Sequence, residues 1–427
     1  MRKFILVLMC LVLLSSVIFA GGNRQNPGQD GKIPLRVVWW GGDIRHRITL
    51  EVIELFEAAH PNITVIPEYM GTDAYFERLT VQLQGGTAPD VIQLGGVQSI
   101  DYAQNGHLLA LNGYRGNILS LPGFDEDVLT INTLDGNLYG ISLGANSRVY
   151  IYNKSLLERA GAPLPPKLMS WEELRRYCLS IAPLLPAGVF PLNDDGGNDA
   201  TIFFAHFSRE NGRPLHRDGE SFVTEADILT WLNRWEGFRA DRIIPDPETA
   251  AQFSGSIDVS MSMLVRGRAV ITQAPSNQFV AYQNAMSDEL ELMLLPNPTS
   301  KANWFQPSQA FSIYRRSSYP DEAAAFINFF VTDLEAGRIL GNERGIPSSQ
   351  HVREVLLNTT NQEDRKLFAF FSDFTDYSSP MDIPIPNTRE FNNTFLLYYQ
   401  QVMFNRITRN QGAQEIYNLI QSLLIPK

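Results

Sequence analysis

The stretch that decides the fold begins with LRVVWWGG at residues 35–42, where an apolar run stops at two glycines. This pattern predicts a strand. A helical stripe of apolar residues follows at 50–57, and further apolar runs at 63–66 and 89–94 flank a predicted helix over 74–84. Strands that alternate with helices predict an α/β fold with a doubly wound, largely parallel sheet.

The alternation continues in the second half of the chain. Ser170-Trp171-Glu172-Glu173 is a capping-box pattern that predicts a helix start. Residues 270–272 and 292–295 are strand-like, and helical stripes occupy 321–332 and 398–423. A chain of 427 residues is long enough for two such units with separate cores.

The N-terminus has the pattern of an export signal. Arg2 and Lys3 precede an almost wholly apolar run at 4–19, and small residues follow, which predicts a signal peptide over 1–20. An uncleaved membrane anchor is the alternative, because the run falls just short of the roughly 20 residues that span a bilayer. Residues 21–34 are rich in glycine and polar residues and predict a flexible leader. We therefore expect export to the periplasm or the extracytoplasmic face, and a soluble protein after cleavage.

The two cysteines predict neither a lipid anchor nor a disulfide. Met9 stands before Cys10, where a lipid-attachment site needs a small residue, so the sequence has no lipobox cysteine. Only Cys178 would remain after cleavage, and a core of this size needs no disulfide. The net charge of −11 argues against a nucleic-acid-binding surface, which needs a basic stripe.

Seven short segments occur in the order that is typical of one protein family. They are VVWWGG at 37–42, Phe56-x4-Pro61-x-Ile63-x-Val65, GGTAPDV at 85–91, YGIS at 139–142 with IYNK at 151–154, GRAV at 267–270, EAA at 322–324 with Phe329, and RGIPS at 344–348. Over 35–349 the chain thus resembles the bacterial extracellular solute-binding proteins, the family similar to maltodextrin-binding protein.

The resemblance implies a two-lobed periplasmic-binding-protein fold of type II, with the ligand cleft between the lobes. Each lobe would be a doubly wound sheet flanked by helices. The N-terminal lobe would comprise 35–145 plus 303–335, and the C-terminal lobe 146–302 plus 336–427. The chain would cross the hinge near Asn146, near 298–303 and near Leu334. A monomer is the usual state in this family.

Candidate ligand-binding residues follow from the strand ends and from the resemblance. Open α/β sheets bind ligands at the carboxyl ends of strands, and sugars are held by aromatic faces and planar polar groups. Strand alternation turns only one of Trp39 and Trp40 towards the cleft. Ser276 stands where the family has a stacking aromatic residue, so Trp304 is a possible substitute, and Arg148 would favour a carboxylated sugar if it faces inward. Arg344 could instead cap the preceding helix. The predicted residues are Trp39, Trp40, Gly42, Asp43, Arg45, Gln93, Gly95, Gln98, Asn146, Arg148, Ser276, Asn277, Trp304, Gln306, Gln309 and Arg344.

Two local motifs suggest a hydrolase or a calcium site, but the residues around each motif do not fit that chemistry. The G-x-S-x-G pattern at 140–144 is followed by a predicted strand, not by the helix of a nucleophile elbow. The run NDDGGND at 193–199 resembles a calcium loop, but Phe204 stands where the loop needs its last acidic ligand. The sequence therefore predicts no catalytic residue, no metal site and no cofactor.

The predicted function is that of a binding protein that captures a mono- or oligosaccharide and delivers it to the membrane permease of an ABC importer. The sequence leaves open whether this sugar contains uronic acid. The main alternative is the same fold with a polyamine, a polyol phosphate or a peptide as its solute. An exported hydrolase is a more remote alternative, because it would need a triad or a carboxylate pair that we do not find.

Overall fold

A computed structural model describes residues 31–95, 98–124, 126–198, 206–207, 209–217, 220–254, 258–297, 301–358, 360–372, 374–381, 385 and 388–424. The predicted signal peptide and residues 21–30 of the leader lie outside these ranges. Among the described helices, none is both long and apolar enough to cross a membrane.

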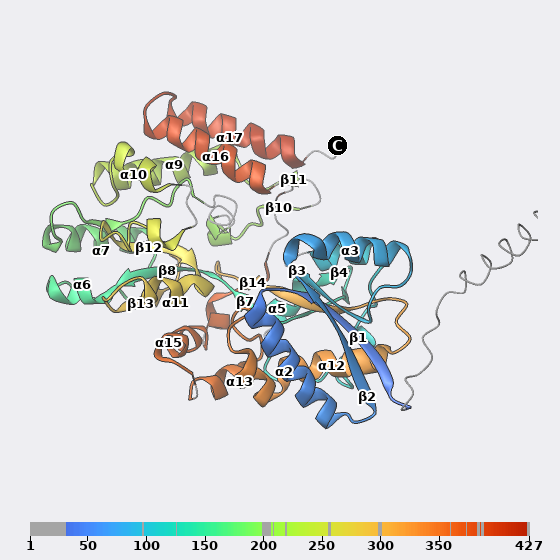
Figure 1. The fold of residues 1–427 in the computed structure, drawn as a ribbon. Helices are drawn as coiled ribbons and strands as arrows, with labels where there is room; N and C mark the ends of the chain where they lie inside the picture. The colour runs from blue at the N-terminus through green and yellow to red at the C-terminus, as the bar shows by residue number, and fades with distance from the viewer. Residues whose placement is uncertain are drawn as a thin grey trace, which may run out of the picture.

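The first lobe is built on a five-stranded sheet. Its order is β2 (Ile63–Met70), β1 (Ile33–Trp40), β3 (Val91–Gly95), β15 (Gln309–Ile313) and β6 (Ile141–Ser142). One core packs this sheet against α2 (Asp43–Ala59), α12 (Pro320–Thr332) and α13 (Leu334–Leu340). A second core packs it against α3 (Thr72–Gln84) and α4 (Gln98–Gln104). The sheet is therefore covered by helices on both faces, with N-terminal and late segments side by side (Figure 1).

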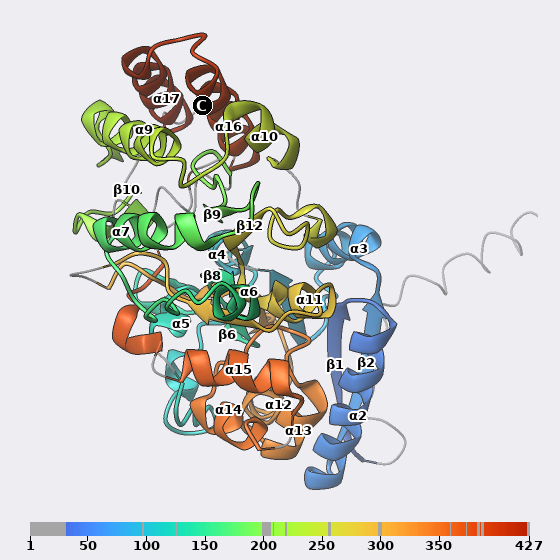
Figure 2. The same ribbon diagram turned by 90° about the vertical axis from the view of Figure 1, so that its left-hand side faces the viewer.

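The second lobe is built on a four-stranded sheet. Its order is β13 (Leu290–Met293), β8 (Arg148–Asn153), β12 (Ala269–Pro275) and β9 (Phe190–Leu192). One core joins it to α7 (Trp171–Ile181), α9 (Glu225–Ala240), α16 (Thr388–Met403) and α17 (Arg409–Leu424). Another core joins it to α11 (Phe279–Asn284) and α15 (Gln362–Phe371). Figure 2 shows α9, α16 and α17 together at the outer end of this lobe, far from α2 and α12.

The remaining elements are short. They are η1 (Asn112–Tyr114), α5 (Glu126–Thr130), β4 (Thr133–Leu134), β5 (Asn137–Leu138), β7 (Ala145–Asn146), α6 (Lys154–Arg159), η2 (Ala182–Leu184), β10 (His216–Arg217), β11 (Glu220–Ser221), α10 (Pro247–Phe253), η3 (Val259–Met261), η4 (Ser276–Gln278), β14 (Gln306–Pro307), α14 (Gln350–Leu356) and η5 (Phe374–Tyr377).

Two sheets flanked by helices confirm the predicted α/β architecture, but the sheets are mixed and not largely parallel. β1 pairs in parallel with β2 and β3, and β12 with β9, whereas β15 and β8 run antiparallel to their neighbours. β8 and β15 each enter their sheet directly after the chain arrives from the other lobe. No helical crossover of the kind that enforces parallel pairing precedes them. The capping box at Ser170 is confirmed, since Ser170 and Glu173 bond each other's backbone N–H at the start of α7.

The lobes are joined where three segments meet at β7. β7 pairs antiparallel with β14, and Ile346 forms a further bridge with Ala145. Figure 1 shows β7 and β14 between the two bodies. The predicted first crossing coincides with β7, whereas the second lies at β14, beyond the predicted 298–303. The third lies near Ile346 and not near Leu334, because α13 still packs on α2 and α12 of the first lobe.

Three predicted boundaries therefore change, and one of them is the boundary between 302 and 303, which shifts to β14. β1 begins at Ile33, inside the predicted leader, because the Ile33 N–H donates to the Asn62 carbonyl and Ile33 pairs with Ile63. Residues 336–340 of α13, which we placed in the C-terminal lobe, pack with the N-terminal lobe. The division into lobes is otherwise kept below as a proposal.

Candidate functional site

A cavity of about 370 Å³ opens in the C-terminal lobe, and we call it the β9 cavity. Its wall comes from the loop after β9, from β12, from α11 and η3, and from α16. Segments almost 200 residues apart in the chain therefore form one surface. Of the predicted site residues, only Arg148 lines it.

Amide side chains dominate the polar part of the wall. They are Asn193, Asn198, Gln273, Gln278, Asn392 and Asn393. Each amide presents both donors and an acceptor in one plane, which suits a ligand with several hydroxyl groups. Phe253, Met263 and Tyr282 supply apolar surface beside them. The cavity thus offers hydrogen-bonding groups for the hydroxyls of a polyhydroxylated molecule and apolar surface for the apolar faces of that molecule.

Asp195 is a buried carboxyl group in this wall. It accepts hydrogen bonds from Asn193 Nδ2 at 2.6 Å and from the Gln273 backbone N–H at 3.2 Å. Burial raises its pKa to about 8, although these two hydrogen bonds oppose the shift. Asp195 is therefore largely neutral at pH 7.

Two other groups complete the polar chemistry of the cavity. Gln273 Nε2 is buried and has no hydrogen-bond partner among the described residues. Arg148 begins β8 opposite Pro275 of β12 and is the basic residue in the described wall. The cavity therefore presents an unused amide donor and a positive charge beside a neutral carboxyl group.

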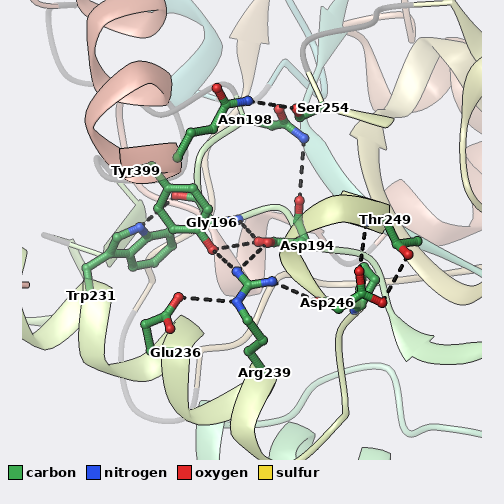
Figure 3. A network of polar contacts seen from close by, with 12 residues as sticks. Asp194, Gly196, Asn198, Trp231, Glu236, Arg239, Asp246, Thr249, Ser254 and Tyr399 are labelled. Atoms are coloured by element: carbon green, nitrogen blue, oxygen red, sulfur yellow. Dashed lines mark hydrogen bonds and ion pairs between the residues drawn. The ribbon is translucent and has the colours of Figure 1, made fainter. Parts of the chain in front are cut away.

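A polar network behind the cavity holds the Asn193–Asn198 loop in place (Figure 3). Arg239 of α9 forms an ion pair with Asp194 at 2.7 Å, and Tyr399 of α16 donates to the same carboxylate at 2.6 Å. Trp231 Nε1 donates to the Gly196 carbonyl at 2.9 Å. These contacts fix the loop to two helices of the core.

The two glycines of the loop allow this close approach. A Cβ on Gly196 would lie 2.5 Å from Tyr399 Oη and 2.6 Å from Trp235 Cγ. One on Gly197 would lie 2.6 Å from Tyr399 Cδ1. These distances leave no room for a larger residue, so the glycines are needed for the loop to pack on α9 and α16. Across the described residues, no group of three or more His, Cys, Asp or Glu residues is placed to hold a metal ion.

The two tryptophans at the end of β1 lie on opposite faces of the sheet, as alternation requires, and both are buried. Trp39 stacks on Tyr69 with ring centroids 5.1 Å apart, and its Nε1 donates to His46 Nδ1. Trp40 packs against Tyr75 and Phe76 and is 9% exposed. Trp40 is therefore the more accessible of the pair, and its contact with a ligand remains a prediction.

The turn after β1 is open to solvent. Gly42 and Asp43 are exposed at the start of α2. Arg45 turns back, and its Nε donates to the Glu343 carboxylate at 3.2 Å. Asp43 is thus available to a ligand, whereas Arg45 already has a partner.

The residues at the end of β3 are mostly engaged within the lobe. Gln93 is fully buried, where Nε2 donates to the Trp40 carbonyl and Oε1 accepts from Arg344 Nε. Gln98 Oε1 accepts from the Gly95 N–H at 3.0 Å. Gln93 therefore supports the strand end from behind.

The hinge brings the remaining partly buried candidates together. Asn146 of β7 pairs with Gln306 of β14, and Gln309 of β15 pairs with Gly95. Asn146 Oδ1 and Gln309 Oε1 are buried and have no hydrogen-bond partner among the described residues. Contact of either oxygen with a ligand remains a prediction.

Three further predicted residues lie in the interior. Ser276 Oγ accepts from the Ser147 N–H at 3.0 Å, so it links η4 to the segment between β7 and β8. Trp304 is 4% exposed in the core of the C-terminal lobe, where it cannot serve as an exposed stacking platform. Arg344 does not cap a helix; its Nη2 donates to Thr49 Oγ1 at 2.8 Å. All three are buried in this conformation, which gives no support to a direct contact with a ligand. Asn277, next to Ser276, is exposed.

Sequence reasoning missed most of the β9 cavity. The run at 193–199 has the pattern of a calcium loop, and its density of amides and carboxylates is also a signal for a polar site. Asn392 and Asn393 lie in an ordinary amphipathic helix pattern, which carries no such signal.

The comparisons with known proteins agree with this fold. Residues 51–336 match the model of the bacterial extracellular solute-binding protein family. An extracellular solute-binding protein family 1 structure from Alicyclobacillus acidocaldarius has a TM-score of 0.83 at 27% identity, over 92% of this chain and 98% of that chain. A periplasmic oligogalacturonide binding protein from Yersinia enterocolitica has a TM-score of 0.77 at 24% identity, over 92% and 99%.

Sequence relatives fall into two groups. A putative binding protein of Brucella abortus is 35% identical over 134 residues, a match that spans 31% of this chain and only 32% of that protein. Diacetylchitobiose binding protein DasA of Streptomyces coelicolor is 22% identical over 370 residues, 83% of this chain and 84% of its own. The family match spans well over half of the chain and confirms the predictions of a binding protein and of no enzyme. The chain therefore belongs to the bacterial extracellular solute-binding proteins.

Proposed function

We propose that the chain captures an oligosaccharide outside the cytoplasm for an ABC importer, and that the β9 cavity holds the ligand on the C-terminal lobe. The observation that carries this proposal is the amide-rich wall, with Gln273 Nε2 buried and unused among the described groups. A buried donor without a partner costs free energy, and a ligand hydroxyl would satisfy it.

Three relatives have names that support a sugar. They are the diacetylchitobiose binding protein of Streptomyces coelicolor, the arabinooligosaccharide-binding protein of Bacillus subtilis and the oligogalacturonide binding protein of Yersinia enterocolitica. Their ligands are chemically different, so the names favour the class of ligand and not one sugar.

A sugar that carries a carboxylate is the second candidate. Arg148 lines the cavity, and a guanidinium binds a carboxylate through two parallel hydrogen bonds. Asp195 would oppose an anionic ligand only when ionised, and its raised pKa keeps it largely neutral at pH 7.

The N-terminal lobe would close over the bound ligand. Asp43 is exposed at the end of β1, and Trp40 and Gln98 lie at neighbouring strand ends of the same lobe. In this proposal the lobes comprise 33–145 plus 306–340 and 146–305 plus 346–427, and the permease recognises the closed form. The chain acts as a monomer, released as a soluble protein by cleavage after residue 20 without a lipid on Cys10.

A thermal-shift screen tests the proposal. The chain from Gly21 would be melted with neutral oligosaccharides, uronic-acid oligomers, polyamines and peptides. A ligand at 100 times its dissociation constant adds about 2.7 kcal/mol to the free energy of unfolding. We expect stabilisation by an oligosaccharide, reduced in Gln273→Ala and unchanged in Asn410→Ala, which alters an exposed amide on α17.

The outcomes are distinct. Stabilisation by uronic-acid oligomers alone would select the second candidate and would depend on Arg148. Stabilisation only by a polyamine or peptide would leave the fold in place and overturn the choice of sugar. Hydrolysis of a glycoside by the pure chain would overturn the binding role itself.

A further inference from the structure

Arg344 carries a buried positive charge whose hydrogen-bond partners are neutral. Its Nε donates to Gln93 Oε1 at 3.2 Å and its Nη2 to Thr49 Oγ1 at 2.8 Å. The guanidinium carbon lies 5.2 Å from the Phe330 ring centroid. The residue is 4% exposed.

The nearby charged groups do not neutralise Arg344. Glu343 is adjacent in sequence, but its carboxylate accepts from Arg45 at 3.2 Å and its side chain is 34% exposed. Burial and the charge of Arg45 lower the pKa of Arg344 to about 9, and Glu343 opposes this shift only in part. Arg344 is thus still charged at pH 7, and a buried charge of this kind is costly unless a counter-ion is close.

Arg344 lines a second, small cavity at the third crossing between the lobes, which we call the hinge cavity. Its volume is about 20 Å³, and Phe330, Leu340, Ser348 and Val352 are among its lining residues. Such a volume holds one water molecule or one monatomic ion, and excludes polyatomic anions such as sulfate.

Two residues that line the hinge cavity each have an unused polar atom. Arg344 Nη1 and Ser348 Oγ are both buried and have no hydrogen-bond partner among the described residues. Both atoms carry a hydrogen that can be donated. A water molecule would accept these bonds but would need acceptors for its own two hydrogens, whereas an anion only accepts and also balances the charge.

We propose that the hinge cavity binds a single halide ion, chloride under ordinary conditions, held by Arg344 Nη1 and Ser348 Oγ. The ion compensates the buried guanidinium. It also joins α12 and α13 of the N-terminal lobe to the crossing segment, in which Ile346 pairs with Ala145 of β7. Halide binding therefore stabilises the hinge.

Crystals of the full exported chain grown in sodium bromide test this directly. The expected result is an anomalous bromine peak within hydrogen-bond distance of Arg344 Nη1 and Ser348 Oγ. A water molecule there, with no anomalous signal, would overturn the proposal, as would an empty cavity.

A solution experiment gives an independent readout. Chloride would be raised from 1 to 100 mM against gluconate at constant ionic strength, and we expect the melting temperature to rise by about 2 °C. Ser348→Ala and Arg344→Met should lose this dependence. Arg338→Met, which removes an exposed arginine of α13, should keep it. If Arg344→Met fails to fold, Ser348→Ala decides, and a chloride dependence that persists in it would contradict the site.

Discussion

Two loops at the ends of sheet strands occupy comparable places in the two lobes and differ in how they are held. The turn after β1 leaves Gly42 and Asp43 exposed, with no atom within 4 Å of a Cβ built on Gly42. The Asn193–Asn198 loop after β9 is fixed by Arg239, Tyr399 and Trp231 (Figure 3). The difference indicates that the loop in the wall of the β9 cavity is fixed by the core, whereas the turn after β1 is not. Under the proposed function, the C-terminal lobe would offer a preformed wall, and the N-terminal turn would adjust on closure.

The largest effect is expected from breaking the support of the β9 loop. Arg239→Met removes the partner of Asp194, whose side chain is 4% exposed, and leaves a buried carboxylate uncompensated. We expect a loss of about 3–5 kcal/mol in the free energy of unfolding, measured by urea denaturation.

The matched control is Arg47→Met on α2. Arg47 pairs with Glu51, and both side chains are well exposed at 65% and 43%. An exposed pair of this kind contributes about 0.5 kcal/mol or less. Equal losses in the two variants would show that the β9 loop is not specially supported.

The next largest difference in stability is expected when one methyl group is added to a glycine in each loop. Gly196→Ala places a Cβ against Tyr399 and Trp235, and overpacking of this kind costs about 1–3 kcal/mol. Gly42→Ala meets open space and should change stability by less than about 0.5 kcal/mol. Thermal melts of both variants check this, and a harmless Gly196→Ala would mean that the loop can move away from α9.

The pH dependence of stability should report on Asp195. Its pKa is raised from 3.8 to about 8 by burial, so the folded state holds a proton that the unfolded state releases above pH 4. The free energy of unfolding should therefore fall as pH rises from about 4 to 8. Asp195→Asn keeps the shape of the side chain and should flatten this slope, measured as the difference between the two denaturation series. A wild-type slope that the variant retains would place the titration elsewhere.

The smallest effect is expected from Asp43→Ala on the open turn. Stability should not change, because the side chain is exposed. Affinity for the ligand found by screening should fall about fivefold to tenfold, which corresponds to one hydrogen bond. Calorimetric titration measures this, and unchanged affinity would remove Asp43 from the site.

The first lobe was the more predictable part of the fold. Its β1–α2–β2–α3–β3 segment forms from consecutive residues. Each strand and helix there has its own spacing of apolar residues, and glycines mark several of the element ends. The second crossing lies beyond the predicted 298–303 because Trp304 and Phe305 still pack in the cores of the C-terminal lobe. The third depends on which lobe α13 packs against. That contact with α2 joins residues almost 300 apart and has no local pattern.

The candidate site was less predictable still. Trp304 has an aromatic ring that could stack on a sugar, yet tertiary packing buries it in the interior. The burial of Trp39 agrees with the alternation that turns only one of Trp39 and Trp40 towards the cleft. The β9 cavity joins a loop, a strand and the late helix α16, so only the folded chain brings Gln273 next to Asp195. Arg148 was identified because it follows the first crossing directly.

The most direct test of the central claim is a crystal structure of the chain with the oligosaccharide that stabilises it. We predict sugar density in the β9 cavity, with a hydroxyl group within hydrogen-bond distance of Gln273 Nε2 and the ligand in contact with Asn392 or Asn393. Density for the sugar outside this cavity, with Gln273 still unpaired, would contradict the account.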